Sequence, residues 1–476
     1  MRLRDGMGQL AIGVEFTTAM HERDVEARLK EAVVRLRFEC PLVAATIEHG
    51  LHHHHPEFGS WVYAPLPNVD AARDWANDTV CYLPSPPIDP ESFVKSTIET
   101  NSIPYVLADG SEQYLRVYLT RPNGTLNTYF LCLHAAHSII DGRPGLNALS
   151  LLLEWMTASD LPGVDELAWG TEHRNLPPGP INATGGPRED WGTKGAELVE
   201  RFLANAADQD NSHGVACNTP HPAVPGKTTH RVLVKFTLEE SAKIARALKT
   251  LGFTFSELVD AACILAAFEQ NPVPPDEVET AFMNSEIVVS LTDRLPPPTD
   301  PRKHLVSCLA FMLSRTDYPL LGSQPRGRAR LLAAMRAVKA QYDWLLANPC
   351  LPHLSAELAP RIAPTKAELA GTGKGAGAGA GTHGLTVTNI GRVENYVAPV
   401  WPGCSGSGSG RSGSGKAVIR VDEMHLAVRW CNPTVHAWSM HGRLSVLLQA
   451  SDVWDRDVLE DFMSIIVEQI SFVVAE

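Results

Sequence analysis

The sequence predicts a protein of two mixed domains in the α/β (α+β) class. Its 476 residues exceed what one hydrophobic core usually holds, which favours two or three domains. Strand-like and helix-like patterns follow one another in both halves of the chain. A stretch rich in Pro, Gly and Asn lies between the halves, from about residue 161 to residue 225. We therefore place an N-terminal domain at 1–190, a connecting segment at 191–225 and a C-terminal domain at 226–476.

The first half begins with a predicted strand and helix. Residues 10–18 alternate in polarity, and apolar residues then recur at helical spacing from Val25 until Pro41 ends the pattern. Two more strand patterns, at 114–120 and 125–133, flank Asn123-Gly124, a pair that tolerates the positive φ of a hairpin turn. Apolar residues at helical spacing follow from 146 to 156. Residues 134–142 are therefore predicted to form a strand-to-helix junction.

The second half repeats the alternation of strands and helices. One helix is predicted near 195–206 within the connecting segment, and residues 230–236 are strand-like. Thr237 with Glu240, and Thr254 with Glu257, are capping boxes that predict the starts of two helices. Further strands are predicted at 286–292, 306–314, 385–391 and 442–450, and a helix ends the chain. Two Gly-rich segments, 371–384 and 403–416, are predicted to be surface insertions.

Composition excludes several classes of function. The formal net charge is −13 and Lys and Arg form no cluster, so we expect neither nucleic acid nor an anionic membrane as a partner. The longest apolar run, 261–268, is too short to span a bilayer, and no secretory segment is predicted. Nine cysteines without CxxC spacing fit a reducing compartment. We expect a cytoplasmic protein, and a monomer.

The junction holds the residues best suited to chemistry. In "LCLHAAHSIIDGRPG", His137, Asp141 and Gly142 follow the predicted hairpin. An imidazole that titrates near neutral pH can remove a proton from a hydroxyl, and a nearby carboxylate can fix its surroundings. The alternative is structural, with Asp141 capping the next helix and His137 an ordinary partly buried histidine. Either interpretation is open on the sequence alone.

Metal binding is a third interpretation of the junction. His134, His137 and Asp141 are all potential ligands, but a strand that enters a turn would have to bend sharply to bring them together. The run His52–His55 beside Pro56 is interpreted as a solvated loop. We therefore predict no metal site and no permanently bound cofactor.

The pattern His-x-x-x-Asp-Gly at the end of a hairpin resembles the CoA-dependent acyltransferase superfamily, which includes chloramphenicol acetyltransferase, the plant BAHD enzymes and the condensation domains of peptide synthetases. The chain most resembles fungal trichothecene 15-O-acetyltransferase-like proteins. The stretches that carry this likeness are "DAARDWANDTV" at 70–80, "LAWGTEHRNLPP" at 167–178 and "LTVTNIGRV" at 385–393. The resemblance extends over nearly the whole chain. It implies two chloramphenicol-acetyltransferase-like mixed-sheet domains with an active-site tunnel at their interface.

The resemblance also implies roles for single residues. His137 matches the general base, and Asp141 matches a structural aspartate that usually pairs with an arginine, for which Arg294 is the candidate. Gly142, Thr388 and Asn389 are the candidate substrate-binding residues, and the last two are candidates to line the site or steady an oxyanion. A strand end followed by a turn before Gly391 would explain Thr388 and Asn389 equally well.

The expected activity follows from the same resemblance. It is transfer of an acyl group, expected to be acetyl, from acyl-CoA as co-substrate to a hydroxyl of a small hydrophobic metabolite such as a terpenoid alcohol. Ala136 stands where condensation domains usually carry a second histidine, and the BAHD signature "DFGWG" is absent, so neither subgroup fits well. The alternatives are cyclisation or rearrangement of a metabolite on the same fold, and a degenerate binding protein that keeps the pocket.

Overall fold

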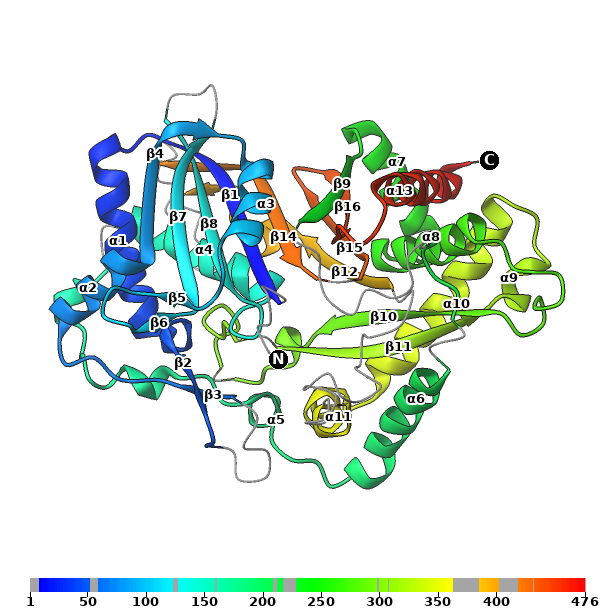
Figure 1. Cartoon of the computed structure of the whole chain (residues 1–476), viewed down its shortest axis with the longest axis horizontal. Coiled ribbons are helices and arrows are strands. Elements are labelled where there is room, and N and C mark those ends of the chain that lie inside the picture. The colour runs from blue at the N-terminus through cyan, green and yellow to red at the C-terminus, as the bar shows by residue number, and fades with distance from the viewer. Residues whose placement is uncertain are drawn as a thin grey trace. The chain divides into compact units, whose positions relative to one another are not determined.

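The computed structural model describes residues 8–51, 59–122, 127–158, 161–208, 212–216, 228–297, 299–306, 308–362, 385–401, 418–430 and 432–475. The chain forms two compact units, each built around a six-stranded sheet (Figure 1). Unit 1 comprises Met1–Pro178, Pro297–Ser307 and Arg392–Arg429. Unit 2 comprises Gly179–Pro296, Cys308–Gly391 and Trp430–Glu476.

The sheet of unit 1 has the strand order β13-β14-β1-β8-β7-β4. Its strands are β1 (Gln9–Thr18), β4 (Val80–Ile88), β7 (Leu115–Pro122), β8 (Thr128–Ala136), β13 (Val400–Trp401) and β14 (Ile419–Arg429). The central strand β1 pairs antiparallel with both β14 and β8, although β14 lies about 400 residues later in the chain. Only the β4–β7 pair is parallel in the part of this sheet that the structure describes.

Helices cover both faces of this sheet (Figure 1). The four long helices of unit 1 are α1 (Glu22–Glu39), α2 (Val69–Thr79), α3 (Pro90–Thr100) and α4 (Gly142–Thr157). Neighbouring residues of a strand face opposite sides, and Ala11 packs in the core beneath α3 while Ile12 contacts α4. A Cβ atom on Gly145 would lie 2.9 Å from Cγ2 of Ile12, so glycine lets α4 approach the sheet closely.

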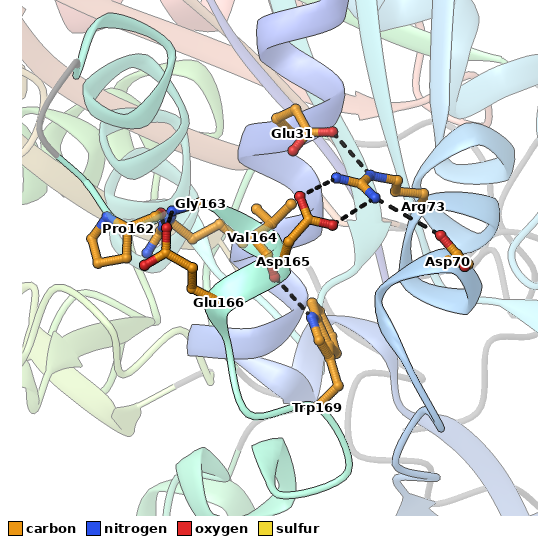
Figure 2. Close-up of polar contacts among 10 residues, drawn as sticks. Glu31, Asp70, Arg73, Pro162, Gly163, Val164, Asp165, Glu166 and Trp169 are labelled. Carbon is orange, nitrogen blue, oxygen red and sulfur yellow. Dashed lines mark hydrogen bonds and ion pairs between the residues drawn. The ribbon is translucent and has the colours of Figure 1, made fainter.

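An arginine joins α1, α2 and the short turn after α4 at the surface of unit 1 (Figure 2). The guanidinium of Arg73 donates two hydrogen bonds to the carboxylate of Asp165, at 3.0 and 2.8 Å, and one to Glu31 at 3.3 Å. Asp70 lies 3.8 Å away on the same helix. These groups are solvent-exposed, so the cluster fixes geometry more than it adds stability.

The buried carboxylate of Glu172 connects the segment after β3 (Gly59–Val62) to the segment after α4 in unit 1 through hydrogen bonds. Glu172 is 0% exposed and accepts hydrogen bonds from the Tyr63 hydroxyl (3.1 Å) and from the backbone N–H groups of Leu66 (2.6 Å) and Gly170 (2.7 Å). Burial of a carboxylate is costly unless such donors satisfy it. The stretch 167–178, which helped to carry the family resemblance, therefore has a structural role that is visible in the fold.

The sheet of unit 2 has the order β11-β10-β12-β15-β16-β9. Its strands are β9 (Thr229–Lys235), β10 (Phe282–Ser290), β11 (Leu309–Asp317), β12 (Leu385–Arg392), β15 (Thr434–Met440) and β16 (Arg443–Ser451). β10 and β12 are parallel, whereas the β10–β11, β15–β16 and β16–β9 pairs are antiparallel.

Two hydrophobic cores hold the helices of unit 2 to this sheet. Its longer helices are α6 (Ala196–Ala207), α7 (Leu238–Leu251), α8 (Phe255–Gln270), α10 (Arg328–Ala347), α11 (Leu354–Ile362) and α13 (Arg456–Ser471). One core packs α7, α8, α10 and α13 against β12, β15 and β16, and the other packs α6 and α11 against β10 and β11. Both predicted capping boxes are present at the starts of α7 and α8.

The remaining elements are short. They are β2 (Thr46–His49), β3 (Gly59–Val62), β5 (Tyr105–Val106), β6 (Glu112–Gln113), α5 (Pro180–Ala183) and α9 (Pro319–Gly322). No single helix in the described ranges is long and apolar enough to cross a membrane. The pair α7 and α8 reaches that length and composition only together, and it is bent by 99°.

The two-sheet α/β fold confirms the predicted class, but the units divide the chain differently from the predicted domains. The segments 297–307 and 392–429 belong to unit 1, and 179–225 belongs to unit 2 instead of forming a separate connector. A sequence pattern gives the order of elements but not which sheet a strand joins. The Gly-rich segments 371–384 and 403–416, the run His52–His55 and the hairpin turn at Asn123-Gly124 lie outside the described residues.

Candidate functional site

His137 is the first residue after β8, in the predicted strand-to-helix junction. Its backbone N–H donates to the carbonyl of Gly8 at 2.7 Å, and the Ala136 carbonyl accepts from Ile139 at 2.9 Å to close a turn. Ile139 and Ile140 are buried, whereas the His137 side chain is partly exposed. The buried side chains of Ile139 and Ile140 therefore hold the turn in place, while the side chain of His137 stays partly exposed.

Asp141 ends this turn, and α4 begins at Gly142 directly after it. Asp141 has extended backbone angles, and its carbonyl accepts from the N–H of Gly145 at 2.7 Å. Its carboxylate makes no hydrogen bond to the first turn of α4, so the helix-capping interpretation of this side chain is wrong. Asp141 as a whole is 7% exposed and therefore buried.

His134, the earlier histidine of the stretch, is a core residue. The ring lies fully buried on β8 and hydrogen-bonds the Tyr105 hydroxyl through Nδ1. With the Gln9 amide oriented so that its nitrogen faces the ring, Gln9 donates to Nε2 at 3.1 Å. Burial, helped by the nearby charge of Arg116, lowers the pKa of His134 to about 3. His134 is therefore neutral over the physiological pH range.

The metal interpretation of the junction finds no support. Among the residues that the structure describes, His134, His137 and Asp141 do not bring three ligand atoms within 4.8 Å of one another. His134 already uses both ring nitrogens within the core. The junction thus contains the partly exposed His137 and, four residues later, the buried Asp141.

Thr388 lies on β12 in unit 2 and belongs to a hydrogen-bonded chain of side chains. Its hydroxyl is 2.7 Å from Nδ1 of His436, and the amide nitrogen of Gln449 is 2.6 Å from Nε2 of that ring. Because the Gln449 amide donates to Nε2, the ring hydrogen of neutral His436 resides on Nδ1 and is donated to Thr388. Within the described residues, this leaves the hydroxyl hydrogen of Thr388 available to another acceptor.

Asn389 points to the other face of β12. Its amide nitrogen donates to the hydroxyl of Ser256 on α8 at 2.8 Å, and its oxygen accepts from the N–H of Gly391 at 2.8 Å. Gly391 has φ of +90°, which a residue with a side chain rarely adopts. Thr388 and Asn389 are thus consecutive but are not brought to the same face, and Asn389 shapes the turn that ends β12.

Arg294, the candidate partner of Asp141, lies in a short helical turn of unit 2 after β10. Its guanidinium donates to the backbone carbonyls of Asn348 (3.3 Å) and Leu346 (2.6 Å), at the end of α10. Burial lowers the pKa of Arg294 from its usual value. These contacts give Arg294 a structural place in unit 2, and its pairing with Asp141 stays a prediction.

The sequence patterns did not predict that His436 and Gln449 form a hydrogen-bonded chain to Thr388, the candidate to steady an oxyanion. His436 and Gln449 lie on the neighbouring strands β15 and β16, and the register pairs His436 with Leu447. Nothing in the local sequence relates either residue to Thr388, which is about 50 positions away from His436. Only the strand order of the sheet brings the three side chains together.

Comparison with known proteins gives a clear result only at the level of structure. No protein-family model matches the chain, and no curated protein sequence matches it. The trichothecene 15-O-acetyltransferase of Fusarium sporotrichioides has a TM-score of 0.77 at 16% identity, over 99% of this chain and 92% of that one.

Condensation domains have the same arrangement. The first condensation domain of the calcium-dependent antibiotic synthetase has a TM-score of 0.59 at 12% identity, covering 99% of this chain and 92% of that one. The condensation domain of the monacolin K polyketide synthase MokA has a TM-score of 0.56 at 11% identity, covering 99% and 93%. With two mixed sheets and their covering helices, the chain has the fold of this acetyltransferase and of the condensation domains, as the chloramphenicol-acetyltransferase-like prediction required.

Proposed function

We propose that the chain is an O-acyltransferase that moves an acyl group, acetyl in the simplest case, from acyl-CoA to a hydroxyl of a small hydrophobic metabolite. One observation carries the proposal. His137 is a partly exposed residue on a turn whose isoleucines are buried, and the buried Asp141 follows four residues later at the start of α4. Such a group can meet a substrate without disturbing the core. The shared fold with a trichothecene acetyltransferase supports the same reaction.

The proposed reaction needs one base and one thioester. A ring nitrogen of His137 removes the proton of the acceptor hydroxyl while the oxygen attacks the thioester carbonyl carbon. The tetrahedral intermediate then expels CoA as a thiolate, which takes the proton back from the imidazolium. The products are the ester and free CoA thiol, so atoms, charge and protons balance without a covalent acyl-enzyme.

Thr388 is the proposed donor to the oxyanion of the tetrahedral intermediate. Its support is the His436–Gln449 chain, which holds the oxygen of Thr388 and leaves the hydroxyl hydrogen for an acceptor. Asn389 serves in this proposal as the residue that positions the end of β12. Gly142 allows close approach of a substrate to the start of α4.

General-base catalysis contributes about 10²- to 10⁴-fold to a rate, and positioning of two substrates can supply much of the remainder. We therefore expect His137→Ala to lower kcat by about two to four orders of magnitude while the melting temperature stays close to that of the wild type. The assay incubates the protein with acetyl-CoA and a panel of terpenoid alcohols and follows the release of free thiol.

A matched variant separates loss of the base from loss of any histidine. His173 is exposed on a surface turn of unit 1, so His173→Ala should keep full activity. Near-native turnover in a folded His137→Ala variant would remove His137 from the mechanism. Conversion of an alcohol without thiol release would favour cyclisation or rearrangement on this fold.

A further inference from the structure

A second group of polar side chains lies on the sheet of unit 2, where β10 and β12 pair in parallel. The register places Glu286 opposite Thr386, and the Thr386 hydroxyl donates to Oε2 of Glu286 at 2.8 Å. Thr386 is two residues before Thr388, the proposed oxyanion donor, on the same strand. Alternate residues of a strand face the same side of a sheet. Glu286 and Thr386 therefore share one face of the sheet with Thr388.

The burial pattern shows that this face is the more accessible side of the strand pair. Leu385 and Val387, which point to the other side of β12, are buried in the core that packs against α8. Thr386, Thr388 and Glu286 are all partly exposed. A molecule that contacts Thr388 can therefore also contact the carboxylate of Glu286.

The Glu286 carboxylate can accept more hydrogen bonds than unit 2 supplies. An ionised carboxylate has room for about four, and Thr386 is its one hydrogen-bond partner in the described part of the chain. Desolvation by the surrounding protein raises the pKa of Glu286, although the hydrogen bond from Thr386 opposes the shift. The carboxylate has thus lost part of its contact with water, so a donor supplied by a ligand would stabilise it.

The hydrogen bond from Thr386 also fixes where the carboxylate lies relative to Thr388. Residues two apart on a strand are separated by roughly 7 Å, and Oε2 of Glu286 stays next to the Thr386 hydroxyl. Val288 is the next partly exposed residue of β10 on this face, so apolar surface lies beside the carboxylate. A ligand that uses both polar contacts would have an apolar body with polar groups several bonds apart.

We propose that Glu286 binds a second hydroxyl of the acceptor, so that the preferred substrates are small hydrophobic diols whose hydroxyls lie several bonds apart. The inference rests on the proposed acyl transfer and on Thr388 as its oxyanion donor. One hydroxyl is acylated while the other donates to Glu286, which determines specificity, and Thr386 is the positioning residue that holds the carboxylate. A hydroxyl suits this place better than an ammonium group, because it costs less free energy to remove from water.

The experiment uses the full chain, acetyl-CoA and matched pairs of terpenoid alcohols. Each pair consists of a diol with hydroxyls several bonds apart and the analogue that lacks one of them, and release of free thiol gives kcat and KM for both. A hydrogen bond to a charged group changes a binding constant by about 10- to 100-fold. We expect the ratio of kcat/KM for the diol to that for its analogue (the diol ratio) to be about 10 to 100, with the difference mainly in KM.

The variants assign this preference to the carboxylate. Glu286→Ala should lower the diol ratio to near one, and Glu286→Gln, which keeps the shape but not the charge, should lower it less. Thr386→Val should also lower it less than Glu286→Ala, because the carboxylate remains but loses the group that holds it. Glu279→Gln is the matched control, since this carboxylate is exposed before β10, and it should keep the wild-type ratio.

The outcomes separate this inference from the proposed function. A diol ratio near one in the wild type, or a wild-type ratio in folded Glu286→Gln, would overturn the role of Glu286 and leave acyl transfer standing. A stronger preference for an amino alcohol than for the diol would assign an ammonium group to Glu286 and overturn the hydroxyl.

A separate measurement covers the case in which no alcohol releases thiol. The proposed acyl transfer then fails, and calorimetric titration of the diol into the wild type and Glu286→Gln tests the carboxylate alone. Binding that is weaker in Glu286→Gln would support the hydroxyl contact, whereas equal or absent binding would overturn it.

Discussion

Asp260 provides a pH-dependent test of the packing in unit 2. It lies on α8 at 2% exposure, and the hydroxyl of Tyr342 donates to Oδ2 at 2.6 Å. Its other oxygen, Oδ1, has no hydrogen-bond partner within the described part of the chain. Burial raises the pKa of Asp260 to about 7, the Tyr342 hydrogen bond opposes this shift, and the charge of Glu257 adds to it.

The sign of the effect follows from the raised pKa. The folded protein holds the proton more tightly than the unfolded chain, so stability is lost as pH rises from about 4 to about 7 and is level above that range. A change from 3.8 to about 7, at about 1.4 kcal/mol per pH unit, corresponds to roughly 4 kcal/mol as an upper limit. Asp260→Asn cannot ionise and should lose this dependence.

The measurement compares the unfolding free energy of wild type and Asp260→Asn by denaturant titration at several values between pH 4.5 and 8. The difference between the two proteins cancels the other titrating groups. Any pH-independent cost of the substitution shifts the difference in unfolding free energy by a constant amount. The titration of Asp260 instead makes that difference change with pH. We expect Asp260→Asn to gain stability relative to wild type as pH rises, by up to about 3 kcal/mol between pH 4.5 and 8. A difference that stays flat over this range would refute the reasoning.

Three further predictions concern unit 1 and the Gly-rich insertion. Glu172→Ala should lower the unfolding free energy by about 1–3 kcal/mol because three donors around a buried carboxylate lose their acceptor, whereas Asp165→Ala, at the exposed ion pair, should cost under about 1 kcal/mol. Asp141→Ala should lower the melting temperature, by an amount corresponding to about 3–5 kcal/mol if its carboxylate is part of a buried ion pair, and an unchanged melting temperature with a reduced rate would place Asp141 in the chemistry. Replacing 404–415 by a short Gly-Ser bridge should leave folding and activity intact, since the cost of loop closure changes slowly with length, and loss of either would contradict this.

The sequence predicted those elements whose signals are local. The helical spacing after Val25 predicted α1, and the capping boxes at Thr237 and Thr254 predicted the starts of α7 and α8. The junction from β8 to α4 was predicted in the same way. In each case, residues within a few positions of one another determine the backbone conformation, so a single sequence contains the information.

The rest depends on contacts between distant segments. The patterns above do not predict β14, because the polar residue His425 is buried against Glu15 and Glu91 instead of facing solvent, which disguises the strand alternation. They also cannot show that Thr388 and Asn389 face opposite sides of the sheet, nor that His436 lies beside Thr388. These features follow from strand order and register, which no short stretch of sequence specifies.

The late position of β14 has a consequence for synthesis of the protein. Until residue 429 has left the ribosome, the edge of β1 that β14 will cover has unpaired backbone N–H and C=O groups. At roughly 5–20 residues per second, the roughly 400 residues between the two strands take about 20–80 s to make. A nascent chain therefore exposes a long apolar strand edge for that time, in which it can pair with another copy. Expression at lower temperature or with chaperones that shield strand edges should raise the yield of folded protein.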